Sequence, residues 1–447
     1  MSNENIDLKM SVNDSEARLA NLSRQAFLSM WSYQNPFYDE GKELCDVLVV
    51  FGDDVIIMSD KVIGYNDEKD AKIAWNRWYR KAVLASVAQL RGALKTIKRS
   101  PETIHLDARI SSPFPLKFPD VDRARYHLVA VAHGSEGQCI RHFGFPSLRL
   151  DSRLLDGAEL LSVGVYFPEF VHVINRTTLD ALFECFDTTA DLVKYLTTKE
   201  TLLTGEHVRL TGEEDLIGSY MRNRRPDGAA PLDLLCDVLD DGVRGVPAGE
   251  WASLSIEQSF LERKALLGPS YLIDGILEQL ASEYRAGRML VGQDEGLAYH
   301  AAAFRVLAAE SRMARMLIGL AVIDILHEHP STFWSTVVES TDQSGVLYLW
   351  LIYPHVPVDV SDEALEATIG YELEKYMFVA MGKFPESHTV LGVAMPNTQS
   401  VRTSQVFKLA ARNHWTPETQ KESESLAQAE GILSNIESTT RVAIRAI

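Results

Sequence analysis

The feature that most constrains the fold of this chain is a pair of short apolar runs joined by a tight polar turn. Residues 47–51 and 55–58 are rich in β-branched side chains, which favour strands. Gly52-Asp53-Asp54 lies between them and is typical of a chain reversal. The sequence therefore predicts a β-hairpin within residues 46–63, in which Asp53 and Asp54 are ordinary turn residues without a chemical role.

Three further segments flank this hairpin. Residues 15–31 and 71–98 have apolar side chains at helical spacing, and the second segment predicts a long amphipathic helix with Trp75 and Trp78 in the core. Residues 126–133 form an apolar run that predicts a buried strand. A helix, a hairpin, a helix and a strand in this order predict an α/β core with a mixed sheet.

The length of 447 residues predicts two or three domains, and a hydrophobic content of 46% is enough to build their cores. We expect an α/β protein with three parts. Residues 1–150 form the mixed-sheet core, residues 151–230 an α/β extension, and residues 231–447 a helical or α+β domain of unknown role. The C-terminal region as a whole is expected to be α/β to mostly helical.

Composition excludes several classes of protein. A net charge of −18 argues against a protein that coats nucleic acid nonspecifically, so any substrate contact must be confined to one surface. The four cysteines lack the spacing of a zinc ribbon or a disulfide framework. No apolar run is long enough to span a bilayer, and the polar N-terminus has no signal-peptide core. We therefore expect a cytoplasmic protein without a membrane partner.

The two ends of the predicted hairpin carry charged side chains. Asp46 opens the first run, and Asp60 and Lys61 close the second. Because a hairpin folds its ends side by side, these groups are expected to meet at one edge of the sheet. Carboxylates hold Mg²⁺ together with its waters, and a lysine can orient an attacking water or offset charge on a phosphate. This combination favours phosphodiester hydrolysis.

The same segment resembles the PD-(D/E)xK superfamily of restriction-endonuclease-like nucleases, in particular its NERD (nuclease-related domain) branch. The resemblance covers about a third of the chain. It rests on an Asp-to-Lys separation of fifteen residues, which is matched by Asp46 and Lys61. The family's acidic residue before that Asp is matched by Glu43, offset by one position, and a Glu on the preceding helix is matched loosely by Glu40. Gln89 corresponds to a glutamine that the family often places on the next helix.

The chain departs from the family pattern at one position. Ser59 stands where the family has a glutamate, and Asp60 follows it. Asp60 can supply the missing ligand if a bulge or the strand end brings it to the same side as Lys61, because strand alternation otherwise separates the two. If no such irregularity exists, the site is degenerate and the domain binds without cutting. Asp60 and Lys61 also have a simpler interpretation, as charged residues at a solvated strand edge. The simpler interpretation of Gln89 is a polar residue at the edge of the core.

Basic side chains gather on the long predicted helix. Arg77, Arg80 and Lys81 are the expected nucleic-acid-binding residues, and a solvated helix face is the competing interpretation. His127 is expected to be a core histidine. His133 lies at the far end of its predicted strand, where an approach to the site is conceivable but is not predicted.

The leading hypothesis is a metal-dependent endonuclease that acts on DNA rather than RNA, and the resemblance adds a role in bacterial defence. The hypothesis assigns Mg²⁺ or Mn²⁺ to Glu43, Asp46 and Asp60, and catalysis to these residues with Lys61 and Gln89. The C-terminal region would bind a protein partner or a second copy of the chain. Two alternatives stay open: a degenerate nuclease fold that binds nucleic acid or a protein, and an unrelated α/β fold.

Overall fold

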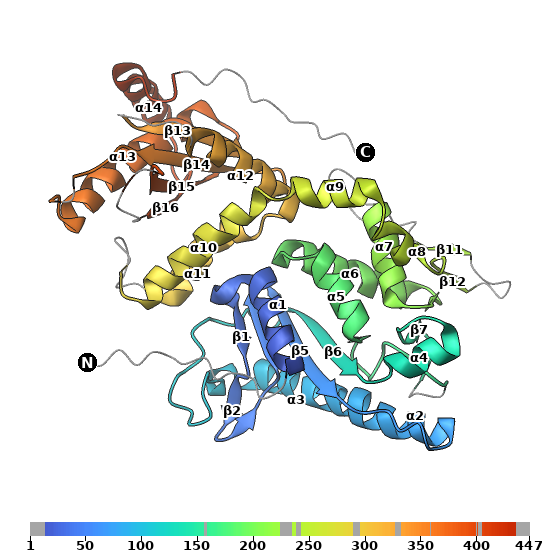
Figure 1. Cartoon of the computed structure of the whole chain (residues 1–447). Coiled ribbons are helices and arrows are strands. Elements are labelled where there is room, and N and C mark those ends of the chain that lie inside the picture. The colour runs from blue at the N-terminus through green and yellow to red at the C-terminus, as the bar shows by residue number, and fades with distance from the viewer. Residues whose placement is uncertain are drawn as a thin grey trace. The chain divides into compact units, whose positions relative to one another are not determined.

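The computed structural model describes residues 14–155, 159–223, 235–237, 243–288, 296–326, 332–357, 359–398, 400 and 405–434. The chain forms two compact units, Met1–Leu261 and Glu262–Ile447 (Figure 1). The domain boundary that we expected near residue 150 therefore falls inside the first unit, because the sheet of that unit takes its last strand from beyond it.

The first unit contains a five-stranded mixed sheet, which confirms the predicted α/β fold class. Its strands, in spatial order, are β1 (Ser32–Gln34), β4 (Val47–Phe51), β5 (Asp54–Val62), β6 (Arg125–His133) and β9 (Val171–Ile174). The first three are antiparallel neighbours, whereas β5, β6 and β9 are parallel. The carboxyl ends of β5 and β6 consequently lie at the same edge of the sheet.

The predicted hairpin is confirmed as β4 and β5. Phe51 pairs with Asp54, so the turn consists of Gly52 and Asp53 alone. Gly52 has a φ of 63°, a conformation that costs glycine little because it lacks a Cβ atom. Every residue of β4 is buried, and burial along β5 extends through Asp60. A strand buried on both faces needs a helical layer on each side.

Those two layers are helical. Helix α1 (Asp14–Trp31) packs against β4 and β5 on one face, whereas α3 (Ala85–Arg99) packs against β5 and β6 on the other (Figure 1). The predicted long helix is continuous, but it consists of α2 (Ala71–Tyr79), a π-helical turn η1 (Arg80–Leu84) and then α3. Trp75 and Trp78 are both buried, as the sequence predicted.

Further helices and short strands complete the first unit. Helix α5 (Arg176–Cys185) packs beside α1, where Phe27 and Phe183 make an edge-to-face contact and Arg18 pairs with Asp180. The helices are α4 (Glu136–Phe143), α5 (Arg176–Cys185), α6 (Thr189–Gly205), α7 (Glu213–Arg222) and α8 (Glu250–Leu254). The strands are β2 (Phe37–Asp39), β3 (Lys42–Glu43), β7 (Arg149–Asp151), β8 (Ser162–Val163), β10 (Arg209–Leu210), β11 (Cys236–Asp237) and β12 (Arg244–Gly245).

The second unit contains a four-stranded sheet of order β13 (Trp334–Glu339), β14 (Val346–Tyr353), β15 (Thr389–Pro396) and β16 (Val406–Ala411). Only β14 and β15 are parallel neighbours. Helix α9 (Gln258–Leu266) spans the boundary between the units, and the other helices are α10 (Ser270–Arg285), α11 (Leu297–Ala308), α12 (Arg312–Leu326), α13 (Asp362–Lys383) and α14 (Pro417–Glu430). Among the described residues, no helix is long and apolar enough to span a membrane.

Candidate functional site

The predicted charged residues gather at the carboxyl ends of β5 and β6. Asp60 and Lys61 lie near the end of β5, His133 ends β6, and Asp46 immediately precedes β4. The carboxylate Oδ2 of Asp46 accepts a hydrogen bond of 2.5 Å from the main-chain amide of Asp60. The carboxyl ends of parallel strands are a common place for ligands in α/β proteins.

Asp60 faces the α1 side of the sheet and is almost completely buried. Its Oδ2 accepts a hydrogen bond from the hydroxyl of Ser15 in α1, and its Oδ1 lies 2.8 Å from Nε2 of His133. His133 was not among the residues that we predicted for the site. Its contact with Asp60 depends on the parallel pairing of β5 with β6, which the sequence does not specify.

Ser59 faces the opposite side of the sheet. Its hydroxyl donates a hydrogen bond of 2.9 Å to Oε1 of Gln89 in α3. The pairing of β5 with β6 runs without a shift from Asp54 to Val62, so strand alternation places Lys61 on the Ser59 side and Asp60 on the other. The bulge that would bring Asp60 and Lys61 to one face does not occur.

Two carboxylates around this edge nevertheless have pKa values that neighbouring acids raise. Burial raises the pKa of Asp46, and the charges of Asp60 and Glu43 add to that effect, while the Asp60 amide and Lys61 oppose it. Burial also raises the pKa of Glu16 in α1, and the charges of Asp46, Asp60 and Glu43 raise it further. Acids that raise the pKa of a neighbouring carboxylate mark a place where a cation is favoured.

The resembled family places a Glu on the preceding helix, and Glu16 of α1 is an acid there that the sequence did not reveal. We assigned that position loosely to Glu40, but Glu40 is exposed and follows β2, whereas Glu16 lies in the first turn of α1. The sequence did offer one indication of Glu16, because residues 15–31 were predicted to be helical and Glu16 lies at the start of that segment. Glu43 is also exposed, at the end of β3, and acts on Asp46 and Glu16 through its charge.

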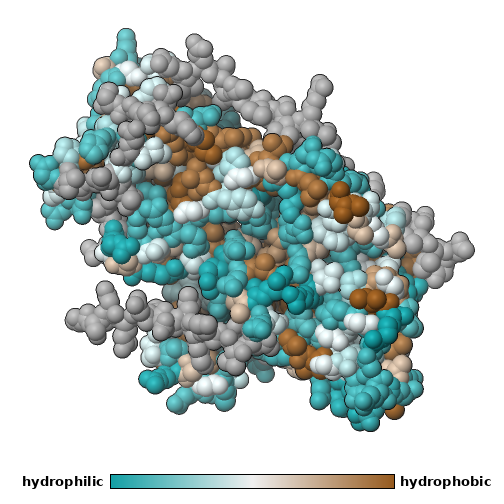
Figure 2. All heavy atoms as spheres, in the orientation of Figure 1, coloured by the Kyte–Doolittle hydropathy of each residue, from teal (hydrophilic) through white to brown (hydrophobic). Residues whose placement is uncertain are grey.

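Helix α2 passes over the same edge of the sheet. The indole Nε1 of Trp78 donates hydrogen bonds to the carbonyl oxygens of Ile63 (3.0 Å) and His133 (3.1 Å). The three predicted basic residues Arg77, Arg80 and Lys81 are exposed, and no ion pair joins them to any residue that the structure describes. In Figure 2 the visible surface around α2 is mostly hydrophilic.

The opposite end of the sheet holds a second polar cluster, which begins at Asp54. Our expectation of Asp54 as an ordinary turn residue was wrong, because Asp54 starts β5 and is buried. Its carboxylate receives hydrogen bonds of 2.7 and 2.6 Å from Arg125, and its Oδ1 lies 3.4 Å from Nε2 of His127. Burial alone would raise the pKa of Asp54, but the hydrogen bonds from His127 and Arg125 lower it.

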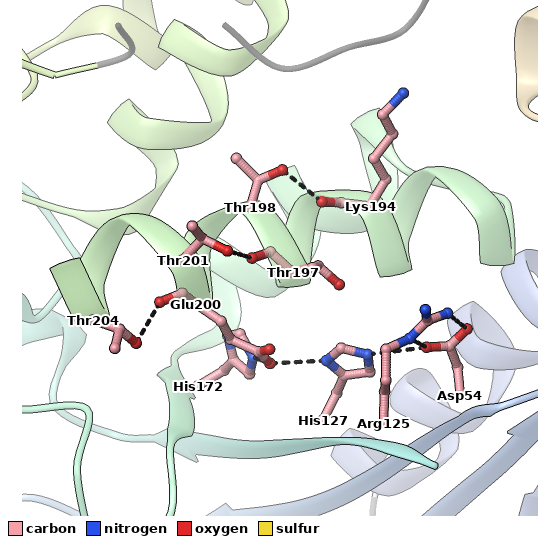
Figure 3. Close-up of polar contacts among 10 residues, drawn as sticks. All are labelled: Asp54, Arg125, His127, His172, Lys194, Thr197, Thr198, Glu200, Thr201 and Thr204. Carbon is pink, nitrogen blue, oxygen red and sulfur yellow. Dashed lines mark hydrogen bonds and ion pairs between the residues drawn. The ribbon is translucent and has the colours of Figure 1, made fainter. Parts of the chain in front are cut away.

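This cluster continues through Glu200 of α6, which lies between two histidines (Figure 3). Its Oε1 is 2.8 Å from Nδ1 of His127 on β6 and 2.9 Å from Nε2 of His172 on β9. Burial opposes the charge of His127, yet its hydrogen bonds to Asp54 and Glu200 raise its pKa to about 9. Burial lowers the pKa of His172 to about 4, and the two histidines lower that of Glu200 to about 2.

The two ends of the sheet differ in how closely their ligand atoms converge. Across the described residues, His127, His172 and Glu200 form the one group of at least three metal-ligating side chains whose ligand atoms all lie within 4.8 Å of one another. The predicted set of Glu43, Asp46 and Asp60 does not meet that distance. His127 was expected to be a core histidine and is buried, but neither His172 nor Glu200 was singled out from the sequence.

Comparisons of this chain with protein families, with curated proteins and with solved structures found no match. Its function therefore has to be argued from the arrangement of its own side chains.

Proposed function

We propose that this protein is a metal-dependent nuclease that hydrolyses phosphodiester bonds at the carboxyl ends of β5 and β6. One observation carries the proposal most directly. The hydrogen bond between the Asp46 carboxylate and the Asp60 amide holds two buried acids, one just before β4 and one in β5, at one edge of a mixed sheet. Lys61, the other residue of the spacing that suggested a nuclease from the sequence, follows Asp60 directly, and its charge lowers the pKa of Asp46.

The donor set suits Mg²⁺ or Mn²⁺. Asp46, Asp60 and Glu16 offer carboxylate oxygens, which are the ligands that these ions prefer. Burial and the charges of neighbouring acids already raise the pKa of Asp46 and Glu16, so a divalent ion would relieve the repulsion. When bound, such an ion polarises a phosphoryl oxygen and lowers the pKa of a coordinated water.

The protein's own groups would complete the chemistry. The charge of Lys61 reaches both Asp46 and Glu16, and in this proposal the ammonium group offsets negative charge on the scissile phosphate. His133 touches Asp60 and holds that carboxylate in place. Trp78 anchors α2 at this edge through its two hydrogen bonds. The basic residues around it would contact the phosphates of the bound strand, namely Arg77, Arg80 and Lys81. DNA is the expected substrate rather than RNA.

A second function is favoured by a specific observation. Asp60 and Lys61 point to opposite faces, and Ser59 is hydrogen-bonded to Gln89 at the position where the resembled family has its glutamate. For this arrangement the sequence predicts a degenerate site that binds nucleic acid without cutting it, so the nuclease proposal requires Glu16 to supply the missing acid. Without that acid the domain would be a recognition module with the same basic surface.

Cleavage assays separate these two functions. Supercoiled DNA, linear DNA and RNA would be incubated with the full chain and Mg²⁺ or Mn²⁺, using wild type, Asp46→Asn, Lys61→Ala and the exposed control Glu40→Gln. We expect metal-dependent cleavage that is lost in the first two variants and retained in the control. Binding without cleavage by the wild type would favour the recognition module, and neither binding nor cleavage would refute both.

A further inference from the structure

We propose that His127, His172 and Glu200 form a binding site for a divalent transition-metal ion, with Zn²⁺ as the expected occupant. The ion would lie where His127 Nδ1, His172 Nε2 and Glu200 Oε1 converge (Figure 3). The two nitrogens are 2.8 and 2.9 Å from that oxygen, and the three ligand atoms lie within 4.8 Å of one another. The site is independent of the proposed nuclease function.

The separations of the ligand atoms are in the range that zinc needs. Ligand atoms of a tetrahedral zinc ion lie about 3.3 Å apart, because each is about 2.0–2.1 Å from the metal. The nitrogen-to-oxygen separations here are somewhat shorter than that, and the two nitrogens lie within 4.8 Å of each other, so the side chains must adjust to take up the metal. Both imidazole rings are buried in adjacent parallel strands, and β6 and β9 are paired directly across Val129 and His172.

The ligand types distinguish this site from the carboxylate site. Two imidazole nitrogens and one carboxylate oxygen suit zinc and other first-row transition metals, whereas Mg²⁺ prefers oxygen ligands alone. The side chain of Glu200 is 27% exposed, so a water molecule can complete the coordination from the solvent side. Three protein ligands and a water are the usual shell of an accessible zinc ion.

The surroundings of His127 support the proposal independently. A histidine that binds metal through one nitrogen usually donates its other N–H group to a carboxylate, which holds the ring in position. Nε2 of His127 lies 3.4 Å from Oδ1 of Asp54, and Arg125 donates two hydrogen bonds to that carboxylate. Arg125, Asp54 and His127 thus form a chain that orients the imidazole toward Glu200.

The same contacts also permit a simpler role. A proton shared between His127 and Glu200 would satisfy the buried groups without any metal, as part of a network of ion pairs. The two interpretations differ in one measurable property, because only the metal site saturates with one ion per chain. A bound ion would also join β6, β9 and α6, which are distant in the sequence, and would therefore raise the thermal stability of the first unit.

The test is zinc binding to the full chain after removal of metal with a chelator. Titration calorimetry would compare wild type with His172→Gln and Glu200→Gln, which retain hydrogen-bonding capacity while altering a ligand. His207→Gln is the matched control, because His207 pairs with Asp151 at 3.0 Å outside the cluster. We expect one Zn²⁺ per wild-type and control chain. Binding by the two ligand variants should be at least about 100-fold weaker, since losing even an outer partner of a ligand typically costs 10–100-fold.

X-ray absorption of the zinc-loaded wild type keeps the proposal testable if a variant fails to fold. The expected spectrum shows two imidazole ligands with zinc–nitrogen distances of about 2.0–2.1 Å. The proposal is overturned if the stripped wild type binds no zinc, if both ligand variants bind it as tightly as the control, or if the spectrum lacks imidazole ligands. Because none of these readouts uses nuclease activity, failure here leaves the proposed function untouched.

Discussion

The carboxylate of Asp46 accepts a hydrogen bond of 2.5 Å from the main-chain amide of Asp60, which lies 14 residues further along the chain. The bond places the end of β5 directly beside the residue that opens β4. It gives Asp46 one fixed donor but leaves its charge in a buried setting where other acids oppose it. In the proposed site, Asp46 is thus held where its charge costs stability until a metal ion offsets it.

Asp46→Asn is therefore expected to stabilise the first unit at neutral pH. Since burial raises the folded-state pKa of Asp46 above its unfolded value of 3.8, its contribution to stability is complete below pH 3.8 and is lost as the pH rises through the folded pKa. Asparagine keeps the acceptor and removes the charge. Thermal unfolding without added metal should show a higher melting temperature for the variant at pH values above the folded-state pKa of Asp46 and a smaller difference near its unfolded value of 3.8.

Added Mg²⁺ should reverse this order. The ion is expected to raise the melting temperature of the wild type and to leave that of Asp46→Asn nearly unchanged, because the variant lacks a carboxylate ligand. An equal stabilisation of both proteins by Mg²⁺ would count against a metal ligand at Asp46.

Glu16→Gln tests the acid that the sequence did not reveal. If Glu16 helps to hold the metal, the variant should lose roughly 10- to 100-fold in the rate of cleavage at low Mg²⁺, with partial recovery at high Mg²⁺. Glu40→Gln is the matched control, because Glu40 is exposed and lies outside the cluster. Equal activity of the two variants would remove Glu16 from the site.

Gly134→Ala is expected to destabilise the first unit by about 1–3 kcal/mol, because the added methyl group overpacks the strand end. Gly134 has a φ of 102°, and a Cβ atom there would overlap the carbonyl oxygen of Ile63, one of the two acceptors of Trp78. Gly137→Ala is the control. A Cβ atom at Gly137 would meet nothing within 4 Å outside its own helix, α4, and a helix tolerates alanine well. Chemical denaturation of both variants measures the difference.

Replacing Arg77, Arg80 and Lys81 together with alanine should weaken DNA binding without unfolding the protein, because all three side chains are exposed. The logarithm of the binding constant should also fall less steeply with the logarithm of the salt concentration, since fewer phosphate contacts release fewer counterions. Fluorescence anisotropy at several salt concentrations measures both effects. An unchanged salt dependence would place the DNA-binding surface elsewhere.

In the second unit, Glu310 predicts a pH dependence of stability. Its carboxylate Oε1 accepts hydrogen bonds from Ser340 (2.5 Å), Gln343 (2.6 Å) and Tyr348 (2.6 Å), whereas Oε2 is buried without a hydrogen-bond partner among the described residues. Burial raises the pKa of Glu310 despite these bonds. Its contribution to stability is therefore complete below its unfolded value of 4.5 and is lost as the pH rises through the folded pKa.

Glu310→Gln should flatten that dependence, because glutamine accepts the same hydrogen bonds and carries no charge. Hydrogen exchange of the β14 amides, followed from about pH 4 to pH 8 with correction for the intrinsic rate, reports the stability of the second sheet. Glu386→Gln, at an exposed position, should retain the wild-type curve. A flat wild-type curve would contradict the expected cost of the buried charge.

The sequence by itself determined the local elements of the first unit. Two apolar runs rich in β-branched side chains and the polar turn between them specified the hairpin, and a regular apolar stripe specified the helix from α2 through α3. Both signals depend on residues that are near one another in the chain. The Asp-to-Lys spacing led to the edge of the sheet where Asp46 and Asp60 meet. Strand alternation places Asp60 and Lys61 on opposite faces, as expected for a strand without a bulge.

The tertiary structure decided which distant groups share a site. Glu16 joins the acids because α1 packs over β4 and β5, and His133 reaches Asp60 because β6 lies parallel to β5. His127, His172 and Glu200 converge only after β9 joins the sheet and α6 packs over it. Such contacts depend on strand order and helix packing, which no local pattern of residues encodes. The same reason explains why Asp54, a turn residue by composition, became a buried partner of Arg125.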